Sequence, residues 1–232
     1  MLSALSFLSI VGRGATPDGR TFRWFPLVGA AIGAVVALSL TGARHVWSYP
    51  LAAAVAVAVD LAITGMLHVD GLADSADGLL PHLDTDRRLE VMRQPDTGAF
   101  ALGAVLIVFL LRWAALAEPV VDPWSLVAVW CISRTVVAVV PVLVPYARPA
   151  GLASAFLAGT DRWIGLAVLP ALALLWWAHG LTGVVAGLTA IAAAAALVAF
   201  ARTRIGGFTG DVLGAAVLVS ETAALLVLAA QP

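Results

Sequence analysis

Long apolar runs separated by short polar segments restrict the fold of this chain more than any other feature of its sequence. An α-helix needs about 20 mainly apolar residues to cross the hydrocarbon core of a bilayer. Runs of this kind occupy residues 26–43, 47–67, 99–117, 123–144, 163–179, 181–200 and 211–230. Only 12% of the residues are charged, against roughly a quarter in a soluble domain. We therefore expect an all-α integral membrane protein, a polytopic bundle of about seven transmembrane helices.

The ends of these runs follow from a few local signals. A break between His179 and Gly180 is predicted to divide one long apolar stretch into the fifth and sixth helices, and Pro170 lies inside the fifth. Residues 1–11 are apolar but too short to span, so we expect them to form an interfacial helix. Because no linker divides the chain, residues 1–232 are expected to form a single membrane domain.

The arginines predict how the bundle is oriented. If the runs cross the membrane alternately, loops on one side contain most of the arginines outside the runs. These are Arg13, Arg20, Arg23, Arg87, Arg88, Arg93, Arg148, Arg162, Arg202 and Arg204. The loops on the opposite side contain only Arg44. Because basic loops remain in the cytoplasm, we expect a cytoplasmic N-terminus.

The longest polar segment, residues 68–98, begins with an acidic motif on the predicted cytoplasmic side. If the second helix continues into it, Asp70, Asp74 and Asp77 fall at i, i+4 and i+7, on one face. Like charges at this spacing destabilise a helix by about 0.2–0.5 kcal/mol per pair. Two interpretations remain open: a site for a divalent cation such as Mg²⁺, which prefers oxygen ligands, or the solvated end of an acidic helix.

The cation interpretation predicts a reaction class. Magnesium bound by a few carboxylates keeps coordination positions open for substrate phosphates, so Asp70, Asp74 and Asp77 are candidate metal ligands and catalytic residues for phosphoryl transfer. Gly71 and Gly78 interrupt the motif. Their missing side chains would let a phosphate or a neighbouring helix approach the backbone closely.

A second polar segment, the Gly-rich loop at residues 202–211, precedes the last apolar run. Glycines at the start of a helix expose backbone N–H groups, which favour anions. The candidate residues for holding a phosphate are Gly206, Gly207 and Thr209, and Asp211 is a candidate metal ligand. The alternative is a flexible turn in which Thr209 caps the following helix.

Charged residues inside the apolar runs are costly and usually face the interior of a bundle. Asp60 and Arg112 are interpreted as structural. Arg134 and Glu221 either form a structural ion pair or contact substrate, and both readings stay open. His68, next to the acidic motif, is either structural or a substrate contact.

Five short segments carry a resemblance to a known family. They are residues 25–29 with Gly33, residues 64–78 (TGMLHVDGLADSADG), the pair Ser133-Arg134, residues 147–152, and residues 206–215 (GGFTGDVLGA) followed by Glu221. In this order they resemble the cobalamin synthase family, the adenosylcobinamide-GDP ribazoletransferases. The resemblance covers most of the chain.

The resemblance implies a Mg²⁺-dependent membrane enzyme of late cobalamin assembly. Members join adenosylcobinamide-GDP to α-ribazole or its 5′-phosphate and release GMP, giving adenosylcobalamin or its 5′-phosphate. The site would face the cytoplasm from the inner (plasma) membrane of a bacterium, with the lipid bilayer, other enzymes of the pathway and a second copy of the chain as partners. The net charge of −1 gives no reason to expect nucleic acid. Arg87, Arg88 and Arg93 are then candidates for stabilising the leaving GMP, and Asp77 for the base.

Two departures and two rival classes accompany the resemblance. Residues 92–98 contain Gln94 and Asp96 where family members often carry an acidic and a basic residue, and Ser75 stands where Thr is common. A membrane transporter would place its binding groups near the middle of the bilayer, not at one edge. A CDP-alcohol-phosphotransferase-like lipid enzyme would have Arg where Asp74 follows residues 70–73.

Overall fold

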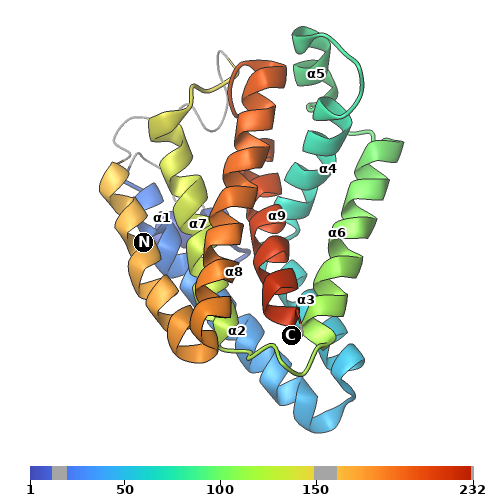
Figure 1. Ribbon diagram of the computed structural model, residues 1–232. Coiled ribbons are helices and arrows are strands. Elements are labelled where there is room, and N and C mark those ends of the chain that lie inside the picture. Colours follow the sequence, from blue (N-terminus) through green and yellow to red (C-terminus); the bar gives the residue numbers. More distant parts are fainter. Residues whose placement is uncertain (12–19, 149–160, 231–232) are drawn as a thin grey trace.

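The computed structural model describes residues 1–11, 20–148 and 161–230, and the described part is built from helices (Figure 1). The elements are α1 (Leu2–Leu8), η1 (Phe22–Trp24), α2 (Phe25–Val46), α3 (Tyr49–Thr64), α4 (Leu67–Leu79), α5 (Thr85–Val91), α6 (Ala99–Ala117), α7 (Ser125–Leu143), η3 (Arg162–Ala167), α8 (Val168–Ile205) and α9 (Gly210–Ala229). The expected all-α fold is therefore confirmed.

The long helices coincide with the apolar runs, and α6 begins and ends at the expected residues. Five described helical segments are long and apolar enough to cross a membrane, and a sixth crossing results if α3 and α4 together form one. The predicted break in α8 is confirmed, because Gly180 has the non-helical angles φ 56° and ψ −135°. Figure 1 shows the two arms of α8 side by side. The chain is a polytopic membrane protein; seven crossings and a cytoplasmic N-terminus stay predictions.

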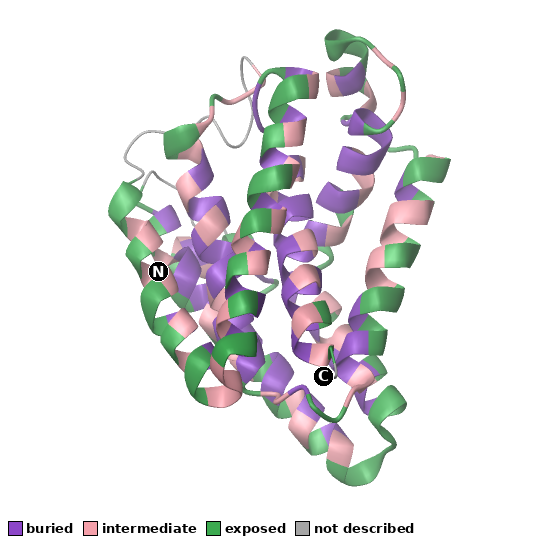
Figure 2. Cartoon of the chain, in the orientation of Figure 1, coloured by how far each residue is buried: buried purple, intermediate pink, exposed green. Residues whose placement is uncertain are grey.

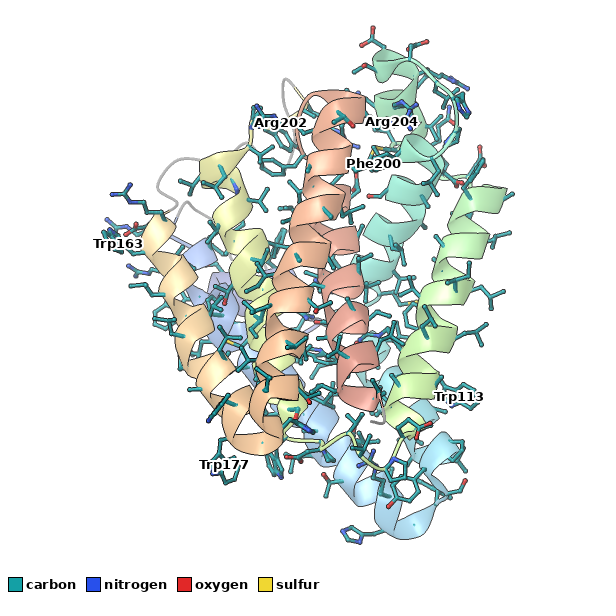
Figure 3. The ribbon with its side chains drawn as sticks, viewed as in Figure 1. Trp113, Trp163, Trp177, Phe200, Arg202 and Arg204 are labelled. Carbon is teal, nitrogen blue, oxygen red and sulfur yellow. The ribbon has the colours of Figure 1, made fainter. Side chains whose placement is uncertain are left out.

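The exposed surface of the bundle is largely apolar, as lipid contact requires. Figure 2 shows exposed residues along the outer sides of α6 and α8. They include Leu106 and Ile107 on α6 and Trp177 and Leu181 on α8, which are 59–81% exposed. In Figure 3, Arg202 and Arg204 lie at one end of the bundle, and Trp113 and Trp177 lie at the other.

Small residues allow α2 and α7 to pack backbone against backbone. A Cβ atom placed on Gly33 would lie 2.5 Å from the carbonyl oxygen of Leu126, and one on Gly29 would overlap that of Trp130. Such contacts need glycine, as is common between helices in membranes. The family-like segment 25–29, with Gly33, therefore has a packing role.

The acidic motif does not continue the second helix. The chain bends by 90° between α3 and α4, so the condition considered for the motif is not met, and Asp70, Asp74 and Asp77 lie instead on the separate helix α4. Gly65 ends α3 in the left-handed conformation at φ 58°, and Met66 follows at φ 59°. A side chain at positive φ is strained, which neighbouring contacts must offset. One such contact joins the backbone N–H of Ile10 to the carbonyl oxygen of Ile63 at 2.9 Å, and it ties the segment after α1 to the bend.

Four buried charges join α3, α6, α7 and α9 at the centre of the bundle. Arg112 pairs with Asp60 at 2.8 Å and with Glu221 at 2.9 Å, and Arg134 also pairs with Glu221. The indole N–H of Trp130 donates to Asp60 at 3.0 Å. The ion pair considered for Arg134 and Glu221 is therefore present, and the two negative charges face two positive ones.

Candidate functional site

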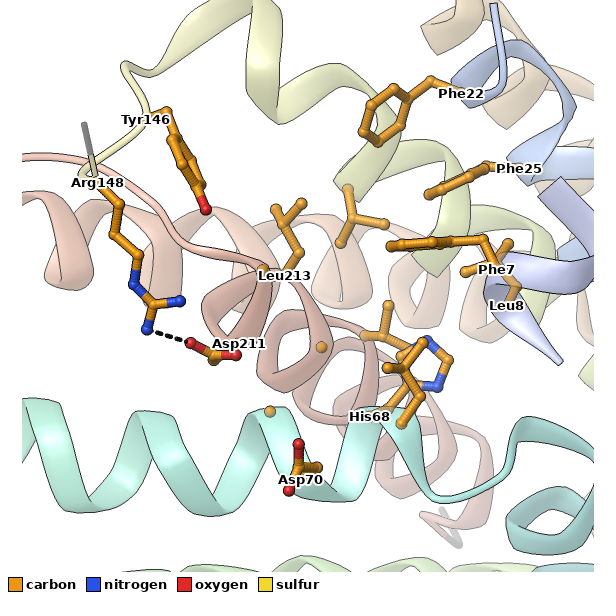
Figure 4. A pocket seen from close by; sticks show the side chains of 16 residues that line it. Phe7, Leu8, Phe22, Phe25, His68, Asp70, Tyr146, Arg148, Asp211 and Leu213 are labelled. Carbon is orange, nitrogen blue, oxygen red and sulfur yellow. Dashed lines mark hydrogen bonds and ion pairs between the residues drawn. The ribbon is translucent and has the colours of Figure 1, made fainter. Parts of the chain in front are cut away.

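A pocket of about 280 Å³ lies between α4 and α9, with α1, the start of α2 and the segment after α7 closing its sides. Figure 4 shows Arg148, Asp211 and Tyr146 at one end and phenylalanine rings at the other. His68 and Asp70 of α4 also line it. The polar end therefore combines acidic and basic groups from two helices and a loop.

The loop before α9 owes its position to a short stretch of backbone pairing. The N–H of Phe208 donates to the carbonyl oxygen of Pro145 at 3.0 Å, and the N–H of Ala147 donates to the carbonyl of Phe208 at 2.9 Å. Gly207 allows this approach, because a Cβ there would overlap the oxygen of Pro145. The pairing brings Arg148 next to Asp211.

Arg148 and Asp211 form the ion pair at the polar end. Nη2 of Arg148 lies 2.8 Å from Oδ2 of Asp211 and also donates to the carbonyl of Met92 at 3.3 Å. The Nε atom of Arg148 is buried and has no hydrogen-bond partner among the residues that the structure describes. The described part of the protein thus leaves one guanidinium N–H of this arginine unused.

Thr209 caps α9, which is the alternative considered for this residue. Its hydroxyl oxygen accepts from the N–H of Val212 at 3.3 Å and donates to Oδ2 of Asp211 at 3.2 Å. Gly206 ends α8 at φ 77° and is exposed. Within the described walls of the pocket, the lining from this loop begins at Gly210 rather than at Gly206 or Gly207.

The contact between α4 and α9 also depends on glycine. A Cβ on Gly71 would lie 2.7 Å from the carbonyl oxygen of Asp211 and 3.1 Å from the Cα of Gly214. Of the two approaches considered for Gly71, that of a neighbouring helix is therefore present. It places the acidic motif beside the first turn of α9.

Carboxylates crowd together at this contact. Asp70 is exposed and Asp74 is half-buried on α4, which is not one of the five long spans. The pKa of Asp74 is raised to about 7, first because burial disfavours its charge and then because Asp211 and Asp70 repel it. Arg148 acts in the opposite direction. The excess of negative charge here would be relieved by a cation.

Asp77 has a different environment from the other two acids of the motif. Its Oδ2 accepts from the N–H of Gly98 at 2.6 Å, and its Oδ1 accepts from the N–H of Ala101 at 2.9 Å. Gly98 is the N-cap residue of α6 and has no side chain to do this. Asp77 therefore caps α6 from another helix.

The arginines proposed to contact GMP lie outside the pocket as described. Arg88 is buried and donates to the carbonyls of Gly78 and Leu79, both at 2.8 Å, which closes the end of α4. Arg87 pairs with Glu90 at 2.7 Å on the surface, and Arg93 is exposed. Arg134 and Glu221 belong to the buried ion network of the spans.

The residues at the polar end fit a magnesium ion. Among the described residues, no three His, Cys, Asp or Glu side chains already form a metal cluster. Mg²⁺ needs no such cluster, because one or two carboxylates plus water and substrate phosphates usually complete its shell. Asp70 and Asp211 both line the pocket, with Asp74 close enough to be affected by their charges.

The pocket residues that sequence reasoning missed include Arg148, Tyr146, Phe7, Phe22 and Phe25. A signal existed for Arg148, since it lies in the family-like segment 147–152, whose residues 149–152 fall outside the described part. Phe25 likewise begins the family-like segment 25–29. Phe7 and Phe22 gave no signal, because apolar residues at helix positions are typical of any membrane bundle.

Comparisons with known proteins identify the family of the chain. The profile of the cobalamin-5-phosphate synthase family matches residues 1–229. An adenosylcobinamide-GDP ribazoletransferase from Bradyrhizobium diazoefficiens is 37% identical over 98% of this chain and 92% of its own length. Relatives of the same name from Prosthecochloris aestuarii and Escherichia coli are 33% and 34% identical, over 95% and 88% of this chain and 92% and 85% of their own lengths. No solved structure matches. The chain, with its full-length match and its acidic pocket at the end of a membrane bundle, belongs to the cobalamin-5-phosphate synthase family of enzymes.

Proposed function

We propose that the chain transfers the adenosylcobinamide phosphate group of adenosylcobinamide-GDP to α-ribazole or its 5′-phosphate in a Mg²⁺-dependent reaction. A ribose hydroxyl oxygen of the acceptor attacks the phosphorus attached to cobinamide. The bond from that phosphorus to the GMP oxygen breaks, GMP leaves, and the hydroxyl proton is lost. The product is adenosylcobalamin or its 5′-phosphate.

One observation supports this function most: Asp70 and Asp211, from α4 and α9, line one pocket with Arg148. Phosphoryl transfer between oxygens depends on positioning and on neutralising charge, with little need for covalent chemistry by the protein. A pocket that combines carboxylates for a cation with a guanidinium for phosphate oxygens provides both.

Asp70, Asp74 and Asp211 would hold the magnesium ion. When bound, Mg²⁺ neutralises charge on a diphosphate and orients its oxygens. Asp77 is also a candidate ligand from the sequence, but its two oxygens already accept hydrogen bonds from backbone N–H groups at the start of α6. We assign Asp77 to holding α6 in place, and its role as a base stays a prediction.

Arg148 is the protein group best placed to hold a phosphate oxygen. Its side chain is 14% exposed at the pocket, and one buried N–H has no partner within residues 1–11, 20–148 and 161–230. Arg–phosphate pairs are strong because the planar guanidinium donates several hydrogen bonds at once. His68 lies further along the same wall, where it can contact the acceptor.

The arginines at one end of the bundle indicate on which side of the membrane the site lies. Arg202 and Arg204 lie at one end of the bundle, opposite Trp177 (Figure 3). The positive-inside rule predicts that this end, and with it the acidic site, faces the cytoplasm. We therefore propose the bacterial inner membrane, with the site open to cytoplasmic substrates.

The test uses the purified full-length protein in lipid nanodiscs with adenosylcobinamide-GDP, α-ribazole and Mg²⁺. GMP release and formation of the cobalamin product are expected, and Asp74→Ala should lower turnover by more than about tenfold. Turnover of the variant within tenfold of the wild type would rule out the metal role. Transport of corrinoid into sealed vesicles without GMP release would favour a transporter, and activity on CDP-linked lipids would favour a lipid enzyme.

A further inference from the structure

The end of the pocket opposite the carboxylates is aromatic, and the phosphoryl-transfer groups do not use it. Phe7 of α1 and Phe22 and Phe25 at the start of α2 gather there (Figure 4). Phe22 and Phe25 are 3% and 2% exposed, so their positions are fixed by packing. Phe7, at 36% exposure, forms the more accessible side.

The three rings form an ordered group rather than a loose apolar patch. The ring centroids of Phe7 and Phe25 are 5.9 Å apart, and their planes are inclined by only 21°. Those of Phe22 and Phe25 are 4.7 Å apart with an angle of 46°. Aromatic groups prefer such stacked or tilted arrangements at about 4.5–7 Å, whereas an alkyl chain has no comparable preference.

The aromatic and polar ends belong to one cavity. His68, Gly71 and Gly214 line it together with both groups of residues, where α4 and α9 approach each other. A molecule that fills the cavity therefore places a flat apolar ring at one end and a polar, oxygen-bearing part near Asp70 and Asp211. A nucleoside with an apolar aromatic base has this shape and chemistry.

We propose that Phe7, Phe22 and Phe25 bind the aromatic base of the acceptor nucleoside and so direct its ribose toward the carboxylates. The identity of the acceptor, α-ribazole with its benzimidazole base, rests on the proposed function. Helix α1 is then part of the substrate site and determines which nucleoside is accepted. This goes beyond the interfacial role expected for residues 1–11.

The test is equilibrium binding of α-ribazole to the full-length protein in nanodiscs, without the corrinoid substrate. Phe7→Ala removes the accessible ring, and Phe25→Leu keeps most of the buried volume while removing the stacking partner. Each should weaken binding by about two- to tenfold. Phe100→Ala, at a 49% exposed position on α6, is the matched control and should bind as the wild type does. Methyl riboside, which lacks the base, should bind all four proteins equally weakly.

Binding of α-ribazole to both variants within twofold of the wild type, with unchanged thermal unfolding, would overturn the proposal. The proposal would also be overturned if the two variants lost binding of an alkyl detergent probe but bound the nucleoside as the wild type does. The aromatic end of the pocket would then hold a lipid chain. The readout is independent of the transferase reaction. Ring-dependent binding without GMP release would contradict only the proposed function, and GMP release with ring-independent binding would contradict only this inference.

Discussion

Nη2 of Arg148 lies 2.8 Å from Oδ2 of Asp211, and this ion pair joins the segment after α7 to the first turn of α9. The pair is only partly buried, with side-chain exposures of 14% and 21%. An ion or a phosphate in the pocket can therefore compete for either partner. Two segments that are 63 residues apart in the chain thus form one binding surface.

Replacing Arg148 by Gln should lower turnover strongly with little loss of folding. The change removes the charge that would hold a phosphate oxygen, and we expect a loss of about a hundredfold in kcat/KM. Arg148→Lys should recover only part of it, because an ammonium group cannot make the paired hydrogen bonds of a guanidinium. Steady-state release of GMP measures both. Arg202→Gln, an exposed residue at the same end, is the control, and equal losses in the two variants would refute a specific role.

Removing the metal should stop the reaction reversibly. Excess EDTA is expected to abolish GMP release, and added Mg²⁺ should restore it. Asp211→Asn removes one anionic ligand, so it should raise the Mg²⁺ concentration for half-maximal rate by about tenfold. Full activity in the presence of the chelator would contradict the metal assignment.

Asp77 should matter for stability through α6. Asp77→Ala leaves the N–H groups of Gly98 and Ala101 without their acceptor, which should cost about 1 kcal/mol of unfolding free energy, as loss of an N-cap does. Asp77→Asn keeps one acceptor oxygen and should retain about half of that stability. Thermal unfolding in detergent measures the difference. Asp96→Ala, at an exposed position, should have no effect; if Asp77→Ala unfolds as the wild type does, the capping role is wrong.

Gly71→Ala should separate α4 from α9. A methyl group there would lie 2.7 Å from the carbonyl oxygen of Asp211, so the helices must move apart. Overpacking of this kind costs about 1–3 kcal/mol, and it should also lower turnover because Asp70 and Asp211 move apart. Gly103→Ala on α6 has no atom within 4 Å of the added methyl group and should unfold at the wild-type temperature or slightly above. A Gly71→Ala protein with wild-type stability and turnover would show that the close contact is dispensable.

Loss of Arg112 should be the most destabilising single change among these. Arg112→Leu would remove the ion pair of Asp60, which keeps the hydrogen bond from Trp130, while Glu221 keeps Arg134. The buried group of Asp60, Arg134 and Glu221 would then carry two negative charges and one positive charge. Breaking a buried pair in this way costs about 3–5 kcal/mol. The yield of folded protein after detergent extraction measures it. The double variant Arg112→Leu with Asp60→Leu restores neutrality and should recover part of the yield. If the single and the double variant both gave the wild-type yield of folded protein, Arg112 would have no structural role.

The sequence alone determined where the helices run and which chemistry to seek. Apolar length, the break at Gly180 and the caps act over one or a few turns, so the limits of α6 and the hairpin of α8 could be predicted. The acidic motif and the Gly-rich loop predicted a polar site, because their carboxylates and exposed backbone N–H groups also lie within a few residues of one another in the chain. The family resemblance of these segments is borne out by the full-length match.

Only the tertiary structure decided which of those polar residues meet. The bend at Met66 has a strained backbone that only contacts with distant residues can offset. The role of Asp77 depends on its contact with α6, whose first residue is 22 positions further along the chain. Arg148 reaches Asp211 only because the loop at Phe208 pairs with the segment at Pro145. Contacts of this kind are set by how the helices pack, which no local pattern encodes, and for that reason the pocket, with its aromatic end, could not be predicted.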